Sequence, residues 1–183
     1  MLKTRFTELV GCSVPIQQAG MGAVAPPELA AAVSEAGGLG MLGTARPGGH
    51  SVKGLSSLLD RLTALTARPF GVNFIVSPLG LPDAPHRCLR SCVTAAEAFQ
   101  GEVVGETPQL DGTRVAVRRL DSLAVNRGTT GLIEAMPLWA GESVSAVKRV
   151  QPAAEIVREL VEEAEPLLQS WGAAHLESAL TPA

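Results

Sequence analysis

The chain has two parts that differ in the pattern of their hydrophobic and polar positions. In the first part, short apolar runs alternate with stretches whose apolar residues recur three or four positions apart. This pattern predicts a strand at 13–18, a helix that begins after Pro26, a strand at 39–42, a helix at 55–65 and a strand at 70–76. Strands that alternate with helices favour a parallel sheet with right-handed crossovers, and therefore the α/β fold class.

The alternation of strand and helix patterns ends at 77–85, and the second part of the chain follows another pattern. Its spacing predicts helices at 88–99 and 152–169, short strands at 102–104 and 114–117, and two short helices around Pro137. We therefore expect a single domain over residues 1–183, with a βαβαβ part at 1–79 and a mostly helical part at 80–183.

Composition and charge exclude several classes of partner. The 183 residues carry a net charge of −3, contain no Tyr and include only 3% aromatic residues, so neither a basic footprint nor a stacking platform for nucleic acid is expected. No apolar run approaches the roughly 20 residues of a membrane-spanning helix, and the first residues do not resemble a signal peptide. Three cysteines without a disulfide spacing are typical of a reduced, cytoplasmic setting.

Candidate binding residues lie just after the first predicted strand and within the third. A Gly20-Met21-Gly22 turn follows the first strand, and Asn73 interrupts the apolar run of the third. Glycines let a ligand approach backbone amides, a thioether packs adaptably on a flat apolar surface, and a buried carboxamide needs a hydrogen-bond partner. Taken alone, a Gly-x-Gly turn occurs in many proteins without a cofactor, and a buried Asn can cap a neighbouring loop.

Two regions of the chain resemble a known family. The run VGCSVPIQQAGMGAVAPPELAAAVSEAGGLGMLGT, followed by RPFGVNFIVSP, is similar to the nitronate monooxygenases, once called 2-nitropropane dioxygenases, over residues 5–78. The segments PHRCLRS and PLWAGESVSAV and the last predicted helix resemble the C-terminal part of that family. These enzymes are FMN-dependent (β/α)₈ barrels. The resemblance implies that Gly20, Met21 and Gly22 line the isoalloxazine ring and that Asn73 hydrogen-bonds FMN.

The resemblance also implies that the middle of the barrel is missing. A complete barrel takes roughly 250 residues and eight strand–helix units, whereas this sequence supplies about three units before a join near Ser77–Ala84. In the family, the absent middle carries the histidine that acts as general base and the glycine-rich loops that hold the FMN phosphate. We therefore expect an incomplete (β/α)₈ TIM barrel that binds FMN weakly and is impaired in turnover.

The histidines offer one candidate for the missing base. His50 follows the second predicted strand and could reach the active face, but no sequence neighbour supplies a partner that would set its tautomer. The alternative is a solvated loop histidine. His86, at the start of a predicted helix, is expected to be structural, and His175 lies in the tail. No catalytic residue is therefore assigned, and His50 is the candidate.

Cys88 and Cys92 stand four positions apart, as on one helix face. They could form half of a metal site, but no second pair of ligands accompanies them, so we interpret them as a buried helix face and predict no metal. By the resemblance, the segment 137–144 packs near the flavin end of the barrel, which makes Trp139 and Glu142 further candidates.

Three functions are compatible with these features. The first is an FMN-dependent oxidoreductase of the nitronate monooxygenase type, which oxidises nitronates or nitroalkanes with oxygen. The second is a non-catalytic remnant or deletion product of such an enzyme, and the third is an enoyl-thioester reductase of the same flavin barrel superfamily. The missing middle separates the first from the second. An incomplete barrel has unpaired strands, so self-association through the open sheet edge is also expected.

Overall fold

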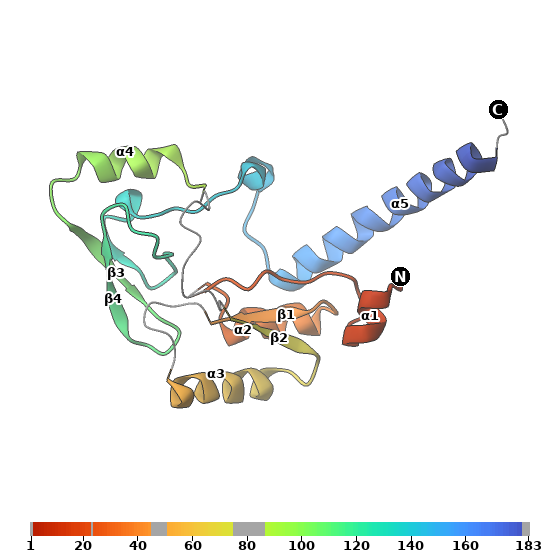
Figure 1. Ribbon diagram of the computed structural model, residues 1–183, viewed down its shortest axis with the longest axis horizontal. Coiled ribbons are helices and arrows are strands. Elements are labelled where there is room, and N and C mark those ends of the chain that lie inside the picture. Colours follow the sequence, from red (N-terminus) through yellow and green to blue (C-terminus); the bar gives the residue numbers. More distant parts are fainter. Residues whose placement is uncertain (1, 23, 45–50, 75–86, 181–183) are drawn as a thin grey trace.

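The computed structural model describes residues 2–22, 24–44, 51–74 and 87–180 (Figure 1). After an unpredicted first helix, the first half follows the predicted alternation of helices and strands. The elements are α1 (Arg5–Val10), α2 (Pro27–Glu35), β1 (Gly40–Gly43), α3 (Val52–Leu65) and β2 (Phe70–Asn73).

β1 and β2 pair in parallel along their full lengths. The strand predicted at 13–18 is reduced to one parallel bridge between Gln17 and Leu39. The Gln18 amide donates to the Leu39 carbonyl (3.0 Å), and the Leu39 amide donates to the Ile16 carbonyl (2.8 Å). Three segments therefore run side by side in the order 16–18, β1, β2, and their carboxyl ends share one edge.

Buried side chains and a glycine hold α2 and α3 against this sheet. Leu42 of β1 and Leu62 of α3 are completely buried in a cluster with Ala30 and Leu58. Gly40 permits the close approach of α2, because a Cβ atom there would collide with the Ala30 carbonyl.

The buried Ser34 hydroxyl of α2 ties the starts of the two strands together. It donates to the Pro69 carbonyl just before β2 (2.9 Å) and accepts from the Gly40 amide of β1 (3.1 Å). One helical side chain thus satisfies backbone groups of both strands.

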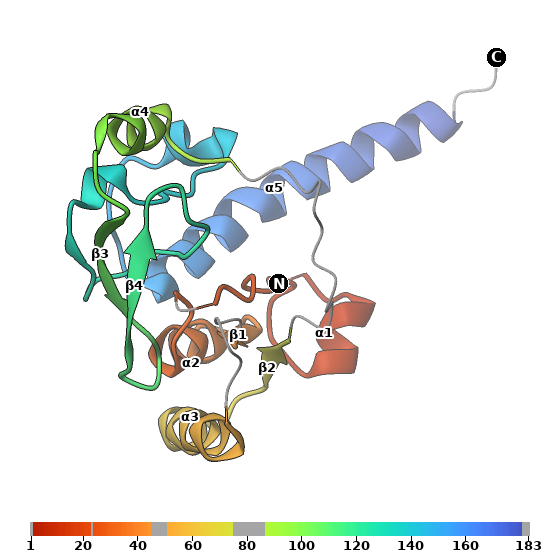
Figure 2. The ribbon, with the colours of Figure 1, turned by 60° about the vertical axis from the view of Figure 1, so that its left-hand side comes forward.

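The second half contains an antiparallel sheet that includes β3 and β4 (Figure 2). In this sheet β3 lies between β4 and β5. The predicted strands at 102–104 and 114–117 are both present, longer than expected, and paired with each other. The two short helices around Pro137 are confirmed as 3₁₀ helices. The elements are α4 (Arg90–Ala98), β3 (Val103–Pro108), β4 (Arg114–Arg118), β5 (Thr130–Gly131), η1 (Ile133–Ala135), η2 (Glu142–Ala146) and α5 (Ala153–Leu180).

The tip of the β3–β4 hairpin connects the two halves. Leu110, in the hairpin turn, packs against the buried cluster that contains Leu42, Leu58 and Leu62. Figures 1 and 2 both show the hairpin reaching from the level of α4 to the level of α2 and α3. The hairpin therefore covers part of the core built by β1 and its helices.

The last helix, α5, is longer than the predicted 152–169 and contains Pro166. Its first turns pack on α2, where Val157 is buried against Val14 and Val33. The predicted apolar stripe is therefore only partly buried, because α2 covers one side of it and the helix then projects from the body (Figure 1). The large exposed residues of the stripe are Ile156, Leu160, Leu167 and Leu168. Neither α5 nor any other helix in the described ranges is long and apolar enough to cross a membrane.

Candidate functional site

The Gly20–Gly22 turn lies directly against Asn73 at the carboxyl ends of the parallel strands. Gly20 packs so closely that a Cβ atom there would overlap the Asn73 side chain. The chain then turns sharply, because the Met21 carbonyl accepts a hydrogen bond from the Ala25 amide (2.8 Å). The glycine turn and Asn73 thus share one edge of the sheet, as the order of the predicted strands indicated.

The end of β1 completes this edge through Gly43 and Thr44. Gly43 lies opposite Asn73 in the strand register, and a Cβ atom at Gly43 would collide with the Met21 carbonyl. The buried Thr44 donates its hydroxyl proton to the Asn73 carbonyl. These contacts join the turn and both strand ends into one unit. We call Gly20–Gly22, Gly43, Thr44 and Asn73 the strand-end site.

Gln18 orients the chain that enters the glycine turn. Its carboxamide donates to the Met41 carbonyl (3.0 Å) and accepts from the Met41 amide (3.4 Å). Because the Gln18 side chain bonds both backbone groups of one residue, through its donor and its acceptor, its orientation is fixed. The segment before Gly20 is therefore held to β1 two residues before that strand ends.

The strand-end site presents polar and apolar groups to a ligand. Within the described part of the chain, the Asn73 carboxamide makes no hydrogen bond, so its donor and its acceptor are both available. The Met21 side chain is 38% exposed. An available carboxamide, an exposed methionine and glycine backbone are groups of the kind that bind the polar edge and the flat face of a heteroaromatic ring.

The candidate base His50 lies outside the described residues, as do His86 and the join at Ser77–Ala84. His175 falls in the part of α5 whose side chains are not described. The proposal of His50 as a base therefore stays a prediction. Across the described ranges, no three metal-binding side chains come together.

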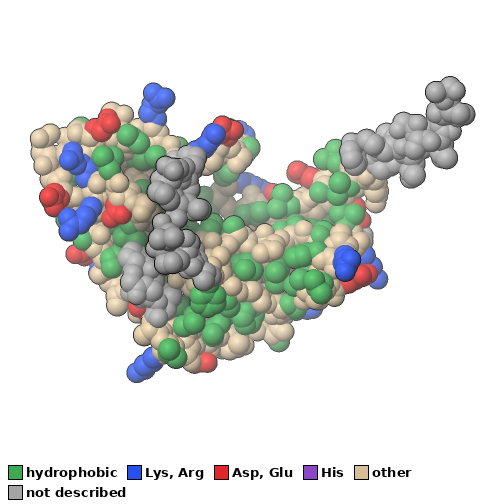
Figure 3. All heavy atoms as spheres, viewed as in Figure 1, with side chains coloured by type: hydrophobic (Ala, Val, Ile, Leu, Met, Phe, Trp, Pro, Cys, Tyr) green, Lys and Arg blue, Asp and Glu red, His purple; other side chains and the backbone are tan. Residues whose placement is uncertain are grey.

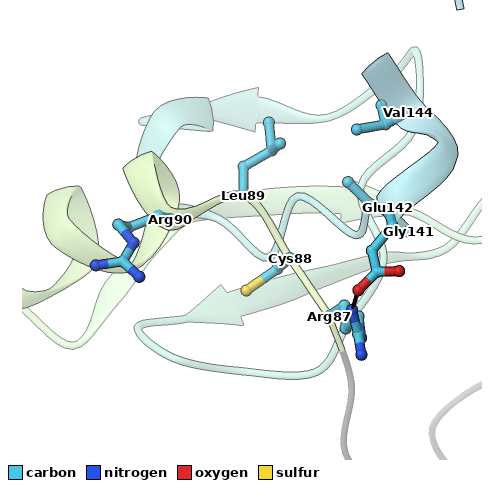
Figure 4. A pocket seen from close by; sticks show the side chains of 8 residues that line it. Arg87, Cys88, Leu89, Arg90, Gly141, Glu142 and Val144 are labelled. Carbon is cyan, nitrogen blue, oxygen red and sulfur yellow. Dashed lines mark hydrogen bonds and ion pairs between the residues drawn. The ribbon is translucent and has the colours of Figure 1, made fainter. Parts of the chain in front are cut away.

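A separate open pocket of about 550 Å³ lies at the start of α4 (Figure 4). Cys88 lines it but does not belong to the helix, which corrects the predicted helix at 88–99. Instead Cys88 forms an antiparallel bridge with Trp139, and this pairing keeps the chain extended until Leu89 caps the helix. Cys92 is buried in the first turn of α4, so the two cysteines do not share one helix face.

The pKa of the Cys88 thiol is raised above its ordinary value. Desolvation contributes most, and the neighbouring Cys92 thiol adds to it through a hydrogen bond and through charge interaction. Cys92 itself donates to the Leu89 carbonyl (3.0 Å). Since an ordinary cysteine is already mostly protonated at neutral pH, the Cys88 thiol is protonated there.

Trp139 and Glu142 belong to this pocket region and not to the strand-end site. Glu142 forms an ion pair with Arg87, and the Trp139 backbone pairs with Cys88. Both views of the ribbon place this segment beside the start of α4, far from the ends of β1 and β2 (Figures 1 and 2). The structure thus brings together Gly20, Met21, Gly22 and Asn73 but adds neither Trp139 nor Glu142.

Sequence reasoning missed Gly43 and Thr44 as members of the strand-end site. The available signal was their place directly after the second apolar strand, since parallel strands end at one edge. The contacts themselves depend on the β1–β2 register, which the apolar pattern does not specify.

Comparison with known proteins assigns the first two thirds of the chain to a family. The family model for nitronate monooxygenase matches residues 3–125. A (3aS,4S,5R,7aS)-5-hydroxy-7a-methyl-1-oxo-octahydro-1H-indene-4-carboxyl-CoA dehydrogenase of Rhodococcus jostii is 44% identical over 86 residues, which are 47% of this chain and 23% of that protein. A nitronate monooxygenase of Pseudomonas aeruginosa is 46% identical over 79 residues, which are 43% of this chain and 22% of that protein.

Among solved structures, a nitroalkane oxidase from Streptomyces ansochromogenes is 36% identical. The match covers 60% of this chain and 30% of that one, with a TM-score of 0.35. The chain thus spans about a quarter of the length of the curated relatives described above.

Proposed function

Because the chain belongs to the nitronate monooxygenase family, we propose that the strand-end site is the flavin-ring part of an oxidoreductase site of the nitronate monooxygenase type. The observation that carries this proposal is the direct packing of Gly20 on Asn73, which unites the two segments that resemble the family's ring contacts. The proposed cofactor is FMN, and the proposed substrates are nitronates or nitroalkanes, with oxygen as the electron acceptor.

Each residue of the site has a proposed role. Asn73 hydrogen-bonds the polar edge of the ring, Met21 packs on its face, and Gly20 and Gly22 let the backbone approach it. Thr44 holds the Asn73 carbonyl and so fixes the backbone that carries the carboxamide. When bound, FMN supplies the redox chemistry, accepting electrons from the substrate and passing them to oxygen.

The proposed fold is an incomplete (β/α)₈ barrel, formed as one domain from the parts at 1–79 and 80–183. In a closed barrel the helices form a ring, so the last helix lies beside the first crossover helix. The packing of α5 on α2 has this arrangement and supports the proposal. The matched part of the chain covers about a quarter of the length of each relative, which agrees with the small number of parallel strands described.

We propose that turnover is impaired in this chain. A positioned general base contributes about 10²–10⁴-fold, and the family's histidine segment has no counterpart in this sequence. A second candidate, a non-catalytic remnant, is favoured by the open sheet, because in the described residues β2 pairs with β1 alone. Oxygen uptake with preformed nitronate and added FMN separates the two. A rate above that of free FMN indicates an impaired enzyme, and an equal rate indicates a remnant.

The strand-end site is tested by substituting the glycine that touches Asn73. Gly20→Ala should weaken flavin binding by about tenfold or more, or about 1.4 kcal/mol, because the new Cβ atom would overlap the Asn73 side chain. Gly141→Ala is the matched control, since the nearest atom to its Cβ position is Ser143 Oγ at 3.9 Å. Quenching of flavin fluorescence measures the affinity of each variant for the flavin. Equal affinities of Gly20→Ala and the unchanged chain would place the flavin elsewhere.

The open edge of β2 and the free thiols support two further proposals. Self-association through this edge is measured by sedimentation at increasing protein concentration. The cytoplasm is the proposed setting, because Cys12, Cys88 and Cys92 are all free thiols.

A further inference from the structure

Two cysteines lie at the start of α4, one just before its N-cap and one in its first turn. The amide and the thiol of Cys92 both donate to the Leu89 carbonyl, at 3.1 Å and 3.0 Å. These two bonds fold the Cys92 side chain back toward the start of the helix, where Cys88 lies one residue before Leu89. The Cys92 thiol thus lies beside Leu89, the residue that follows Cys88, and its influence on the pKa of the Cys88 thiol agrees with this placement.

The backbone on either side of Cys88 is fixed against a second segment. The Leu89 amide donates to the Leu138 carbonyl (3.0 Å), and the Ala140 amide donates to the Arg87 carbonyl (3.1 Å). This short antiparallel pairing, which includes Cys88 and Trp139, holds the Cys88 backbone beside the first turn of α4. A pair of thiols held in this way has little freedom to lose when a bond forms between them.

We propose that Cys88 and Cys92 form a reversible intramolecular disulfide on exposure to hydrogen peroxide. Peroxide converts the Cys88 thiol to a sulfenic acid and releases one water. The Cys92 sulfur then attacks the sulfenic sulfur, the S–S bond forms, and the hydroxyl group leaves with the Cys92 proton as a second water. The two thiols lose two electrons, and one peroxide molecule is reduced to two waters.

The solvent exposure of the two thiols determines which one reacts with peroxide and which one resolves the sulfenic acid. Cys88 is half-buried and lines the open pocket (Figure 4), so peroxide reaches it from solvent. Cys92 is buried and acts as the resolving thiol. The raised pKa of Cys88 keeps its thiol protonated at neutral pH, so the first step is slow and requires excess peroxide. Dithiothreitol reverses the product.

The third cysteine provides an internal contrast. Cys12 is buried, and its thiol donates to the Val14 carbonyl (3.3 Å). Cys12→Ala therefore leaves a chain whose two remaining thiols are the proposed pair.

The test treats the full chain carrying Cys12→Ala with peroxide, blocks free thiols with N-ethylmaleimide, and measures the intact mass and the peptides. We expect both thiols to become resistant to N-ethylmaleimide, a monomer lighter by two hydrogens, a peptide that links Cys88 to Cys92, and full recovery with dithiothreitol. Adding Cys92→Ser should stop the reaction at a sulfenic acid on Cys88, which dimedone traps. Circular dichroism checks that this variant is folded.

Three results would overturn the proposal, and none of them needs a variant at Cys88 or Cys92. One is that both thiols stay reactive under conditions that fully oxidise free dithiothreitol. Another is that Cys88 proceeds to sulfinic acid while Cys92 keeps its thiol. The third is that the oxidised product is a disulfide between two chains.

Discussion

At the scale of single residues, small side chains decide where the backbones meet. Gly20 and Gly43 each occupy a position where a Cβ atom would overlap a neighbouring segment. The sequence predicted that Gly20 and Asn73 share an edge, because both end strands of one parallel sheet. It did not predict the role of Thr44, since that contact depends on the register between β1 and β2.

A polar contact at this scale gives a prediction about stability. Ser34→Ala should lower the free energy of unfolding by about 1–3 kcal/mol, because the Pro69 carbonyl and the Gly40 amide each lose a buried partner. Ser57→Ala, on the exposed side of α3, is the control and should change it by less than about 0.5 kcal/mol. Urea denaturation measures both. Equal stability of the two variants would show that water replaces the Ser34 hydroxyl.

At the scale of elements, the sequence predicted the helices and strands with strong periodicity. The alternation predicted α2, β1, α3 and β2, whereas the six-residue helix α1 is too short to show a period. The length of the β3 strand was underestimated because Gly105 interrupts its apolar pattern. The register with β4 shifts between Val103 and Gly105. Short and irregular elements thus depend on pairing partners that a local pattern does not contain.

The packing of α3 gives a prediction that compares two leucines of one helix. Leu62 is completely buried against the sheet, whereas Leu65 is 45% exposed. Leu62→Ala should therefore destabilise the protein by about 2–5 kcal/mol, and Leu65→Ala by less than about 1 kcal/mol. Thermal or urea unfolding checks the difference. Similar losses for the two variants would mean that α3 does not pack as described.

At the scale of the whole molecule, the two halves of the chain pack against each other at two places. α5 packs on α2, and the hairpin tip at Leu110 covers the core of the first half. Apolar side chains are widely exposed on the face shown in Figure 3, and Phe74, directly after β2, is 56% exposed. The resemblance to a family of longer proteins predicted an open sheet. The contacts between the two halves could not be predicted, because they join residues far apart in the sequence.

We propose, as the central claim, that this chain keeps the contacts to a flavin ring but lacks those to the phosphate. Phosphate contacts normally give FMN an advantage over riboflavin, which shares the ring but carries no phosphate. The most direct measurement is therefore the dissociation constant of each flavin, determined by fluorescence quenching in the same buffer. We expect weak binding of both, with constants within about threefold of each other. Binding of FMN about tenfold or more tighter than riboflavin, or failure of both to bind, would contradict the claim.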